Sequence, residues 1–249
     1  MGENKVGKIV SQTWNPFTGC TKISPACQNC YAETFAIKLN KWGTAGYDNK
    51  FNFTIHYDRL EKAIPLKRKK PTFYFINSMS DTFHEHAQDS DIDKIMDIVE
   101  KASWHNFYFL TKRSARMRDY FNKRNVPDNC WIGVTVEDKK YGLPRIKDLQ
   151  AIKAKNKHLC CEPLLEDLGE FNLDQISLII AGGESGNKAR RVELSWVESL
   201  QNQCKIQNVH FFWKQWGSYD QEGNFSGKAK TGYLINGKVA QSIPENFMP

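Results

Sequence analysis

The sequence predicts an α/β protein built on a partial or complete parallel (βα) barrel of six or seven units, with a C-terminal extension. Three observations predict this fold. Short continuous apolar runs recur from residue 72 onward, most are followed by a helical stretch, and polar residues gather where each run ends. Continuous apolar runs are typical of parallel strands buried on both faces. A doubly wound open sheet is the alternative architecture.

The expected units can be read in order along the chain. The strands are expected at TFYFIN (72–77), NFYFLT (106–111), CWIGVTV (130–136), KHLCCE (157–162), SLIIAG (177–182) and VHFFW (209–213). The helices are expected at 89–102, 114–122, 140–153 and 193–207, with only a short turn after the fourth strand. We expect one domain over 1–249, divided into a cysteine loop with the first helix (1–43), a basic aromatic insertion (44–71), the βα repeats (72–216) and a C-terminal arm (217–249).

The N-terminal part precedes these repeats. Residues 8–14 are expected to form a strand that leads into the cysteine loop. Residues 31–42 predict a helix, with Phe35, Leu39 and Trp42 on one face. The following segment lacks a regular period, which favours an insertion or crossover.

The most informative stretch is TWNPFTGCTKISPACQNCYA at 13–32, which holds Cys20, Cys27 and Cys30 in a loop rich in Gly, Pro, Ser, Thr and Asn. Three soft thiolates at this spacing favour zinc or an iron-sulfur cluster. A structural zinc site wants a fourth protein ligand, and the nearest histidines, His56, His84 and His86, lack finger-like spacing. A cluster that keeps one iron free of protein needs only three thiolates. Buried, reduced cysteines without a metal are the third interpretation.

Composition limits the class of protein. The 249 residues are 40% hydrophobic, enough for a core, and no run of eighteen apolar residues or secretory leader occurs, so we expect a cytoplasmic protein without a membrane partner. The seven cysteines suggest reduced thiols rather than disulfides. The net charge of +7 suits a polyanionic partner or a solvated surface. Part of the charge lies in two clusters, Lys67 to Lys70 and Lys112, Arg113, Arg116 and Arg118.

Polar residues at the strand ends predict a collective site, because ligands bind at the carboxyl ends of parallel strands. For any single residue, a helix cap or a turn is the simpler interpretation. Trp213, Trp216 and Tyr219 beside Lys214 suit either a base-stacking platform or a core. The candidate residues are Asn77 to Asp81, Thr111 to Arg113, Glu137, Asp138, Glu162, Glu184 and Lys214 to Trp216.

Several of these motifs together resemble a known family. They are the run 14–32, NSMSD (77–81), LTKR (110–113), VTVED (134–138), EPLL (162–165), GGESG (182–186) and FFWKQWG (211–217). In this order they resemble an uncharacterised family of phages and bacteria that has a three-cysteine motif. That family looks like a compact member of the radical S-adenosylmethionine (radical SAM) superfamily, distantly similar to spore photoproduct lyases.

This resemblance implies a radical SAM-like barrel and a radical enzyme. Its cofactors would be a four-iron four-sulfur cluster on Cys20, Cys27 and Cys30, and S-adenosylmethionine. Its partners would be an external electron donor, a protein encoded by a neighbouring gene, and DNA or RNA carrying a substrate nucleobase. The usual place of a GGE-like motif is held here by NSMSD.

The same resemblance implies roles for the strand-end residues. Binding of the cofactor is assigned to Asn77, Ser78, Ser80, Asp81, Glu137 and Glu184. Catalytic roles are assigned to Lys112, Glu162 and Lys214. Lys112 and Lys214 would meet substrate anions or transfer protons, and Glu162 would bind the cofactor or substrate. Two other classes of function stay open: a zinc-stabilised nucleic-acid-binding module without catalysis, and a cluster-bearing electron-transfer or scaffold protein.

Overall fold

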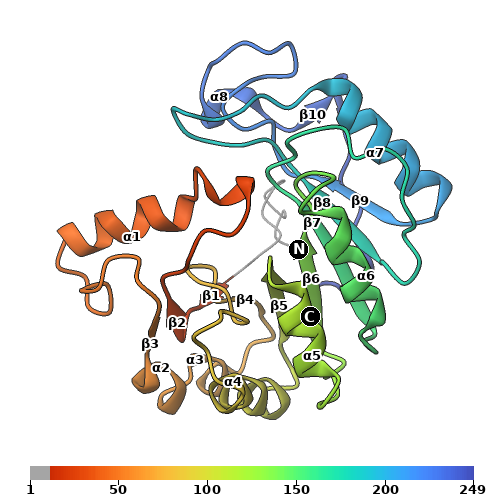
Figure 1. The fold of residues 1–249 in the computed structure, drawn as a ribbon. Helices are drawn as coiled ribbons and strands as arrows, with labels where there is room; N and C mark the ends of the chain where they lie inside the picture. Colours follow the sequence, from red (N-terminus) through yellow and green to blue (C-terminus); the bar gives the residue numbers. More distant parts are fainter. Residues whose placement is uncertain (1–11) are drawn as a thin grey trace.

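The computed structural model describes residues 12–249, and its centre is a seven-stranded parallel sheet (Figure 1). The strand order is β1-β4-β5-β6-β7-β8-β9, so neighbours in the sheet follow one another along the chain. A doubly wound sheet would reverse its order at a switch point, and this sheet does not. Within the described residues, no strand pairing joins β9 to β1. The prediction of a parallel βα fold is confirmed in its partial, open form.

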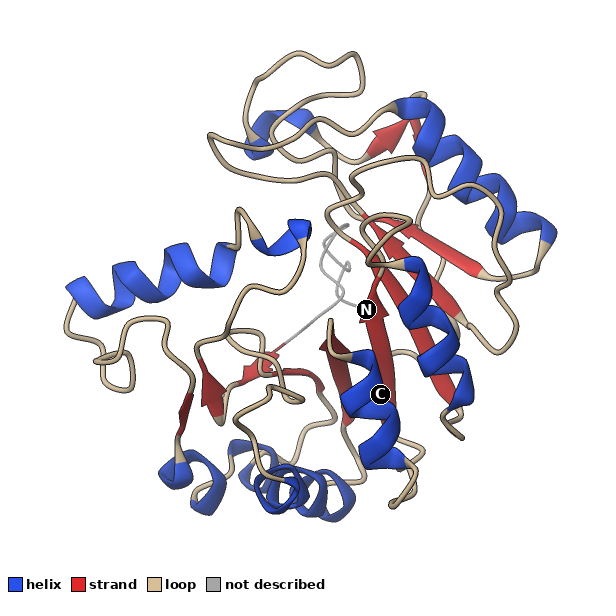
Figure 2. Cartoon of the chain, viewed as in Figure 1, coloured by secondary structure: helices blue, strands red, loops and turns tan. Residues whose placement is uncertain are grey.

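The strands are short and lie close to the expected apolar runs. They are β1 (Gln12–Trp14), β4 (Phe73–Ile76), β5 (Asn106–Thr111), β6 (Cys130–Thr135), β7 (Asn156–Cys161), β8 (Leu178–Ala181) and β9 (His210–Trp213). Residues 8–11 of the expected first strand lie outside the described residues. Helices alternate with the later strands and cover one face of the sheet (Figure 2). They are α4 (Asp89–Lys101), α5 (Ser114–Phe121), α6 (Leu143–Ala151) and α7 (Leu194–Ile206).

The core has two layers because side chains alternate across each strand. The outer layer packs against the helices and includes Ile132, Leu159 and Ile179. The inner layer fills the amino-terminal end of the barrel with Phe73, Tyr108, Trp131, Leu178, Ile180 and Phe212. Phe247 from the C-terminal arm completes it, 4.6 Å from the Phe73 ring and 4.8 Å from the Trp131 ring between centroids.

Smaller elements surround the sheet. The antiparallel pair of β2 (Phe17–Thr18) and β3 (Thr54–Ile55) flanks the cysteine loop, and β10 (Leu234–Ile235) pairs with β11 (Lys238–Val239) in the C-terminal arm. The remaining helices are η1 (Pro25–Cys27), α1 (Tyr31–Lys41), α2 (Tyr57–Glu61), α3 (Ile64–Lys67) and α8 (Lys228–Thr231). Among residues 12–249, none of the helices is both long and apolar enough to cross a membrane.

Helix α1 forms over the expected residues, with Phe35 and Trp42 on one side of it. Its buried side chains are Ala32 and Ala36, which pack with Tyr47 and Met79. Phe35 and Trp42 are 45% and 69% exposed, so the side that carries them is not the buried one. In Figure 1, α1 projects to the side of the barrel, away from the sheet.

Trp213 and Trp216, by contrast, belong to the core. Their side chains are fully buried, and their rings meet at 4.8 Å in an edge-to-face arrangement. The indole N–H of Trp216 donates to the Leu234 carbonyl oxygen. Their stacking is therefore internal, and the structure does not present them as a platform for nucleobases.

Candidate functional site

The cysteine loop begins at the carboxyl end of the barrel, directly beside the turn that follows β4. The Gly19 N–H donates to the Met79 carbonyl oxygen at 2.9 Å, and the Cys20 N–H donates to the Phe51 carbonyl oxygen at 3.1 Å. Gly19 has a φ of +76°, and a Cβ there would lie 2.1 Å from the Asn52 carbonyl oxygen. Only glycine therefore lets the chain pass at this point, which places Cys20 at the opening of the barrel.

Cys27 and Cys30 follow at the other end of the loop. Cys27 ends the short helix η1, its N–H bonds to the Ser24 carbonyl oxygen, and its Sγ lies 3.8 Å from the Ser24 hydroxyl. Cys30 is the N-cap residue of α1. Both thiols, like that of Cys20, are free and half-buried. Over residues 12–249, no three His, Cys, Asp or Glu side chains converge closely enough to hold a metal ion.

Arg113, at the end of β5, connects the barrel to the cysteine loop. One guanidinium N–H group lies 3.5 Å from Cys20 Sγ and 3.1 Å from an Asp81 oxygen, and another donates to Thr21 Oγ1 at 2.7 Å. Its Nε donates to Glu85 at 2.6 Å. Burial, and next the Asp81 carboxylate, raise the pKa of Cys20 to about 11, and Arg113 opposes both effects.

The turn after β4 carries four of the expected cofactor-binding residues, and the structure shows what each contacts. Asn77 Oδ1 accepts from the Phe17 N–H at 2.8 Å, and Ser78 Oγ donates to Asn15 Oδ1 at 3.1 Å. Ser80 Oγ donates to the Gly19 carbonyl oxygen. Asp81 accepts from Thr111 Oγ1 through both carboxylate oxygens and from Arg113. These four residues lie beside the cysteine loop and hold its first half in place.

Glu184, in the GGESG loop after β8, holds the second half of the cysteine loop. Its Oε2 accepts from Asn29 Nδ2 at 3.0 Å and from the Arg190 N–H at 2.8 Å. Arg190 also pairs with Glu184 through its guanidinium group and donates to the Pro25 carbonyl oxygen at 3.1 Å. The loop is thus held from β4 and β5 on one side and from β8 on the other.

We expect Glu184→Gln to loosen residues 24–31 without unfolding the protein. The substitution removes charge-assisted hydrogen bonds to Arg190 and Asn29, each stronger than a neutral bond. Amide hydrogen exchange in a peptide covering this segment should accelerate about tenfold. The control is Glu193→Gln, which breaks the exposed pair with Arg191. Equal exchange in both variants would contradict the role given to Glu184.

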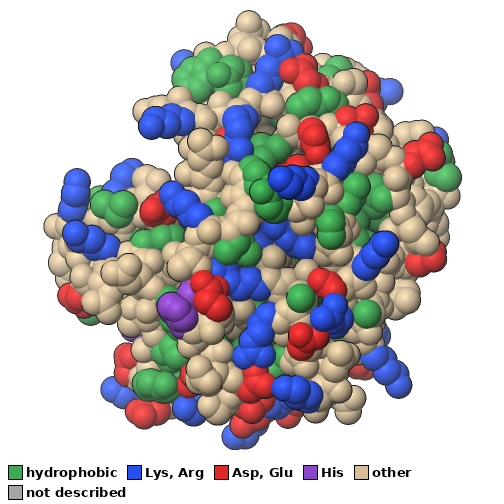
Figure 3. All heavy atoms as spheres, viewed as in Figure 1, with side chains coloured by type: hydrophobic (Ala, Val, Ile, Leu, Met, Phe, Trp, Pro, Cys, Tyr) green, Lys and Arg blue, Asp and Glu red, His purple; other side chains and the backbone are tan. Residues whose placement is uncertain are grey.

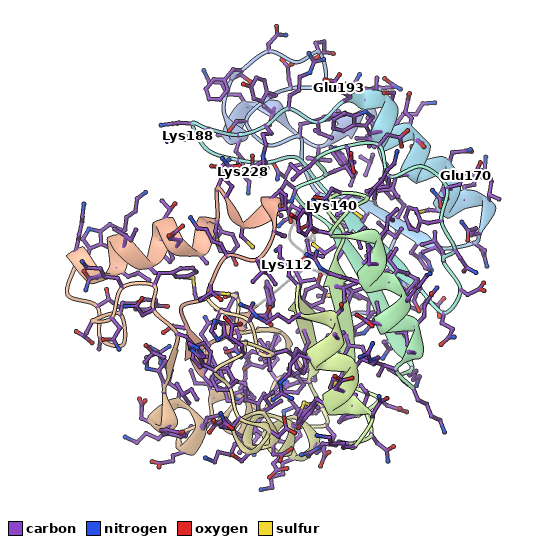
Figure 4. All side chains as sticks on the ribbon, viewed as in Figure 1. Lys112, Lys140, Glu170, Lys188, Glu193 and Lys228 are labelled. Carbon is purple, nitrogen blue, oxygen red and sulfur yellow. The ribbon has the colours of Figure 1, made fainter. Side chains whose placement is uncertain are left out.

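The catalytic candidates lie around the barrel opening. Lys214 Nζ bonds to Glu162 Oε2 at 2.8 Å, and Gln215 Nε2 donates to Glu162 Oε1 at 3.1 Å. Lys112 has no side-chain hydrogen bond or ion pair within residues 12–249, and Figure 4 places it at the centre of the opening. Burial and then Glu162 raise the pKa of Cys160 to about 12, whereas Lys214 and Lys112 oppose this. Lys112, Glu162 and Lys214 therefore act on one region of the barrel interior.

The Glu162 and Lys214 pair should stabilise the fold equally across neutral pH. Burial raises the pKa of Glu162, but Lys214, helped by Gln215 and Lys228, lowers it by more, so that it lies below 4.5. Glu162 in turn raises the pKa of Lys214 above 10.5. The pair's contribution is then lost only as pH falls below about 4.5 or rises above about 10.5. The Tm difference between wild type and Glu162→Gln should stay constant from about pH 6 to 9 and shrink in acid. A difference that changes through neutral pH would argue against this ion pair.

Glu137 has a different environment from the other candidates. Its side chain is fully buried, and both carboxylate oxygens accept from Arg145, at 2.5 and 3.3 Å. Arg145 also donates to the Thr135 carbonyl oxygen at 2.7 Å, so the pair joins α6 to the end of β6. The geometry assigns Glu137 to a structural ion pair and gives no support to cofactor binding by this residue.

Asn29 and Tyr31 were not among the candidate residues, and the contact that Arg113 makes was not predicted. Arg113 follows Lys112 in one basic run, and only the fold shows that Arg113 faces Cys20. Tyr31 follows Cys30, and its hydroxyl donates to the Ser78 carbonyl oxygen at 2.5 Å across the opening. Asn29 lies between Cys27 and Cys30, and no sequence pattern indicates that its amide donates to Glu184.

Of the two basic clusters seen in the sequence, only Lys112 and Arg113 contribute positive charge at the opening. Residues 67–70 precede β4 and so lie at the other end of the strands. Arg116 and Arg118 pair with Asp89 and with Asp119 and Asp148. Figure 3 shows Lys and Arg side chains along a hollow between α1 and the upper part of the molecule. Lys112, Lys188 and Lys228, labelled in Figure 4, border this opening.

Fold and site together define an open parallel βα barrel with a three-cysteine loop held at the carboxyl ends of its strands. The chain belongs to the DUF5131 family of proteins of unknown function, whose model matches residues 7–244. No curated protein sequence matches it.

Among solved structures, the chain is similar to a cysteine-to-serine mutant of spore photoproduct lyase, with 13% identity and a TM-score of 0.46 over 79% of this chain. It is also similar to a double mutant of spore photoproduct lyase with bound AdoMet and dinucleoside spore photoproduct, with 12% identity, a TM-score of 0.41 and 77% of this chain covered. The matched regions span 62% and 60% of those two chains, so this chain corresponds to only part of their length.

Proposed function

We propose that this protein is a radical SAM enzyme. The proposal rests chiefly on one observation: three free cysteines lie on a single loop at the opening of a parallel βα barrel. Carboxyl ends of strands are where such barrels bind their ligands. Three thiolates leave one iron of a four-iron cluster free of protein, which is the position that S-adenosylmethionine would take.

The residues present fit such a cluster by donor type and by charge. Cys20, Cys27 and Cys30 would hold it, and thiolates are the ligands that iron-sulfur clusters require. Arg113 lies against Cys20, and the Lys22 ammonium is within electrostatic range of Cys30 and Cys27. Because the thiols do not converge in the described part of the chain, binding the cluster includes a rearrangement of this loop. When bound, the reduced cluster would supply an electron for cleavage of S-adenosylmethionine and so give the protein radical chemistry for removing a hydrogen atom from a substrate.

The chain's own residues bind and orient in this proposal. The turn with Ser78, Ser80 and Asp81 lies beside Cys20, and Glu184 lies beside Asn29, so both border the place of the cofactor. Lys112 has no ionic partner among the described residues and would meet an anionic group of the substrate. Lys214, held by Glu162, is placed to bind substrate or to hold a proton at Nζ.

A nucleobase in DNA or RNA is the substrate class that we propose. Support comes from the net charge of +7 and from the lysines that border the opening, since a phosphate backbone is bound by such cations. The enzyme would also need an external electron donor, and we propose a protein encoded by a neighbouring gene as a further partner.

The test is formation of 5'-deoxyadenosine and methionine by anaerobically reconstituted protein with S-adenosylmethionine and a reductant. The proposal predicts both products in equal amounts. A non-enzymatic zinc-stabilised module would give neither product and would bind nucleic acid without a reductant. A cluster protein for electron transfer or scaffolding would retain iron without binding S-adenosylmethionine in calorimetry.

A further inference from the structure

Helix α1 carries an unusual outer surface. Tyr31, Phe35 and Trp42 are 63%, 45% and 69% exposed, respectively. At 3.6 residues per turn, these three residues and Lys38 fall within a sector of about 60° around the helix axis. They form a continuous stripe of three aromatic rings and one ammonium group, which we call the α1 stripe.

Apart from Tyr31, whose hydroxyl bonds to Ser78, the α1 stripe lies outside the buried contact that attaches the helix to the barrel. Ala32 and Ala36 on a neighbouring face pack with Tyr47 and Met79 and bury that side of the helix. Large aromatic side chains left outside a core usually mark an interaction surface when they are grouped. The grouping of the three rings, rather than the exposure of any one, therefore points to a ligand.

Charge around the stripe selects the kind of partner. Lys38 and Lys41 have no ion pair within residues 12–249, and the one acidic residue of α1, Glu33, is paired with Lys22 at 2.7 Å. A surface made for an apolar protein partner would be depleted of unpaired lysines. Aromatic rings interleaved with cations are instead the arrangement that binds single-stranded nucleic acid, because bases stack on rings and lysines meet phosphates.

The stripe is continuous with the opening of the barrel. Tyr31 follows Cys30 and donates to the Ser78 carbonyl oxygen at the turn after β4. From Tyr31 to Trp42 the helix extends about 16 Å at 1.5 Å per residue. A strand lying along this length would lead directly to the cysteine loop.

We propose that the α1 stripe binds unpaired nucleotides next to the substrate nucleotide and guides a single strand, or a locally opened one, to the barrel opening. This inference rests on the proposed nucleic-acid substrate and adds to it the strandedness and the place of contact. Phe35 and Trp42 supply stacking surfaces, Lys38 contacts a phosphate, and Tyr31 lies where the strand enters.

The test is fluorescence anisotropy with a labelled twelve-nucleotide single strand, as DNA and as RNA, against a duplex of the same sequence. The full-length protein is compared with Phe35→Ala, Trp42→Ala and Lys38→Gln. We expect Kd for single strands to rise about tenfold for each lost ring. Lys38→Gln should lower the slope of log Kd against log salt by about one, which corresponds to the loss of one phosphate contact. Ile206→Ala, at a 74% exposed position on α7, is the matched control and should bind as wild type.

Phe35→Leu and Trp42→Leu remove the stacking ring but keep an apolar side chain of similar bulk. They therefore separate weaker nucleic-acid binding caused by loss of the ring from weaker binding caused by misfolding. Weaker binding by these variants at an unchanged Tm would support the inference. Equal Kd values in all variants, or preference for duplex, would overturn it. Variants that sediment differently from wild type but bind nucleic acid equally well would also overturn the inference. That result would assign the α1 stripe to contact with a second copy of the chain. The binding assay needs neither cluster nor reductant, so failure of the radical chemistry alone would leave its result intact.

Discussion

Cys27→Ala and Cys30→Ala should each abolish cluster binding and 5'-deoxyadenosine formation. Two remaining thiolates cannot hold a four-iron cluster that already leaves one iron without a protein ligand. We expect iron and sulfide content after reconstitution to fall to the level of an unloaded control, and deoxyadenosine to fall at least a hundredfold. The measurements are metal analysis, absorbance of the reconstituted protein, and chromatography of the products.

The matched control for these variants is Cys204→Ala, a buried thiol on α7 that packs in the core. It should reconstitute like wild type, although the shortened side chain will cost some stability. Retention of iron by Cys27→Ala or Cys30→Ala would show that the loop is not the cluster site. Loss of iron in Cys204→Ala with an unchanged Tm would place a ligand elsewhere.

Glu137→Ala should destabilise the fold by about 3–5 kcal/mol, because it leaves the Arg145 guanidinium buried without its partner. This cost is large compared with the total stability of an ordinary domain. Urea denaturation followed by circular dichroism measures it. The result distinguishes a structural ion pair from the role in cofactor binding that the sequence suggested for Glu137.

Glu162→Gln is the comparison for that experiment. Its partner Lys214 is 36% exposed and can be hydrated when the charge on residue 162 is lost, so stability should change far less. If Lys214 contacts the substrate, Glu162→Gln should lower the enzymatic activity more than Glu137→Ala does. A Glu137→Ala protein as stable as wild type would remove the structural assignment of that residue.

The sequence was sufficient to predict a parallel α/β fold because the signal is repeated. Runs such as CWIGVTV and SLIIAG are too short and too apolar for any role except a strand buried on both faces, and each is followed by helical or turn residues. The structure then decided between an open barrel and a doubly wound sheet through its strand order. Connections of similar length serve both architectures, so the apolar pattern alone could not separate them.

The candidate site was predictable in its location but less so in the task of each residue. Proximity to a strand end puts Asp81, Glu137 and Glu184 in one class, yet their partners differ: Arg113, Arg145 and Arg190. Such partners are set by tertiary contacts between distant segments. Arg113 reaches a cysteine 93 positions earlier in the chain, and no local pattern records that contact.

Helix α1 shows the limit of periodicity in another way. The positions of Phe35 and Trp42 predicted the helix correctly but did not show which side of it is buried. An apolar stripe is usually the buried one. Here Ala32 and Ala36 face the cluster with Tyr47 and Met79 instead, and this contact depends on the tertiary fold.

Electron paramagnetic resonance of the reduced, reconstituted protein reports both the cluster and its open iron. We expect an iron-sulfur signal, with about four iron atoms per chain, that changes when S-adenosylmethionine is added and disappears in Cys30→Ala. Equimolar zinc that survives reconstitution, with no such signal, would contradict it. So would a cluster signal that S-adenosylmethionine leaves unchanged.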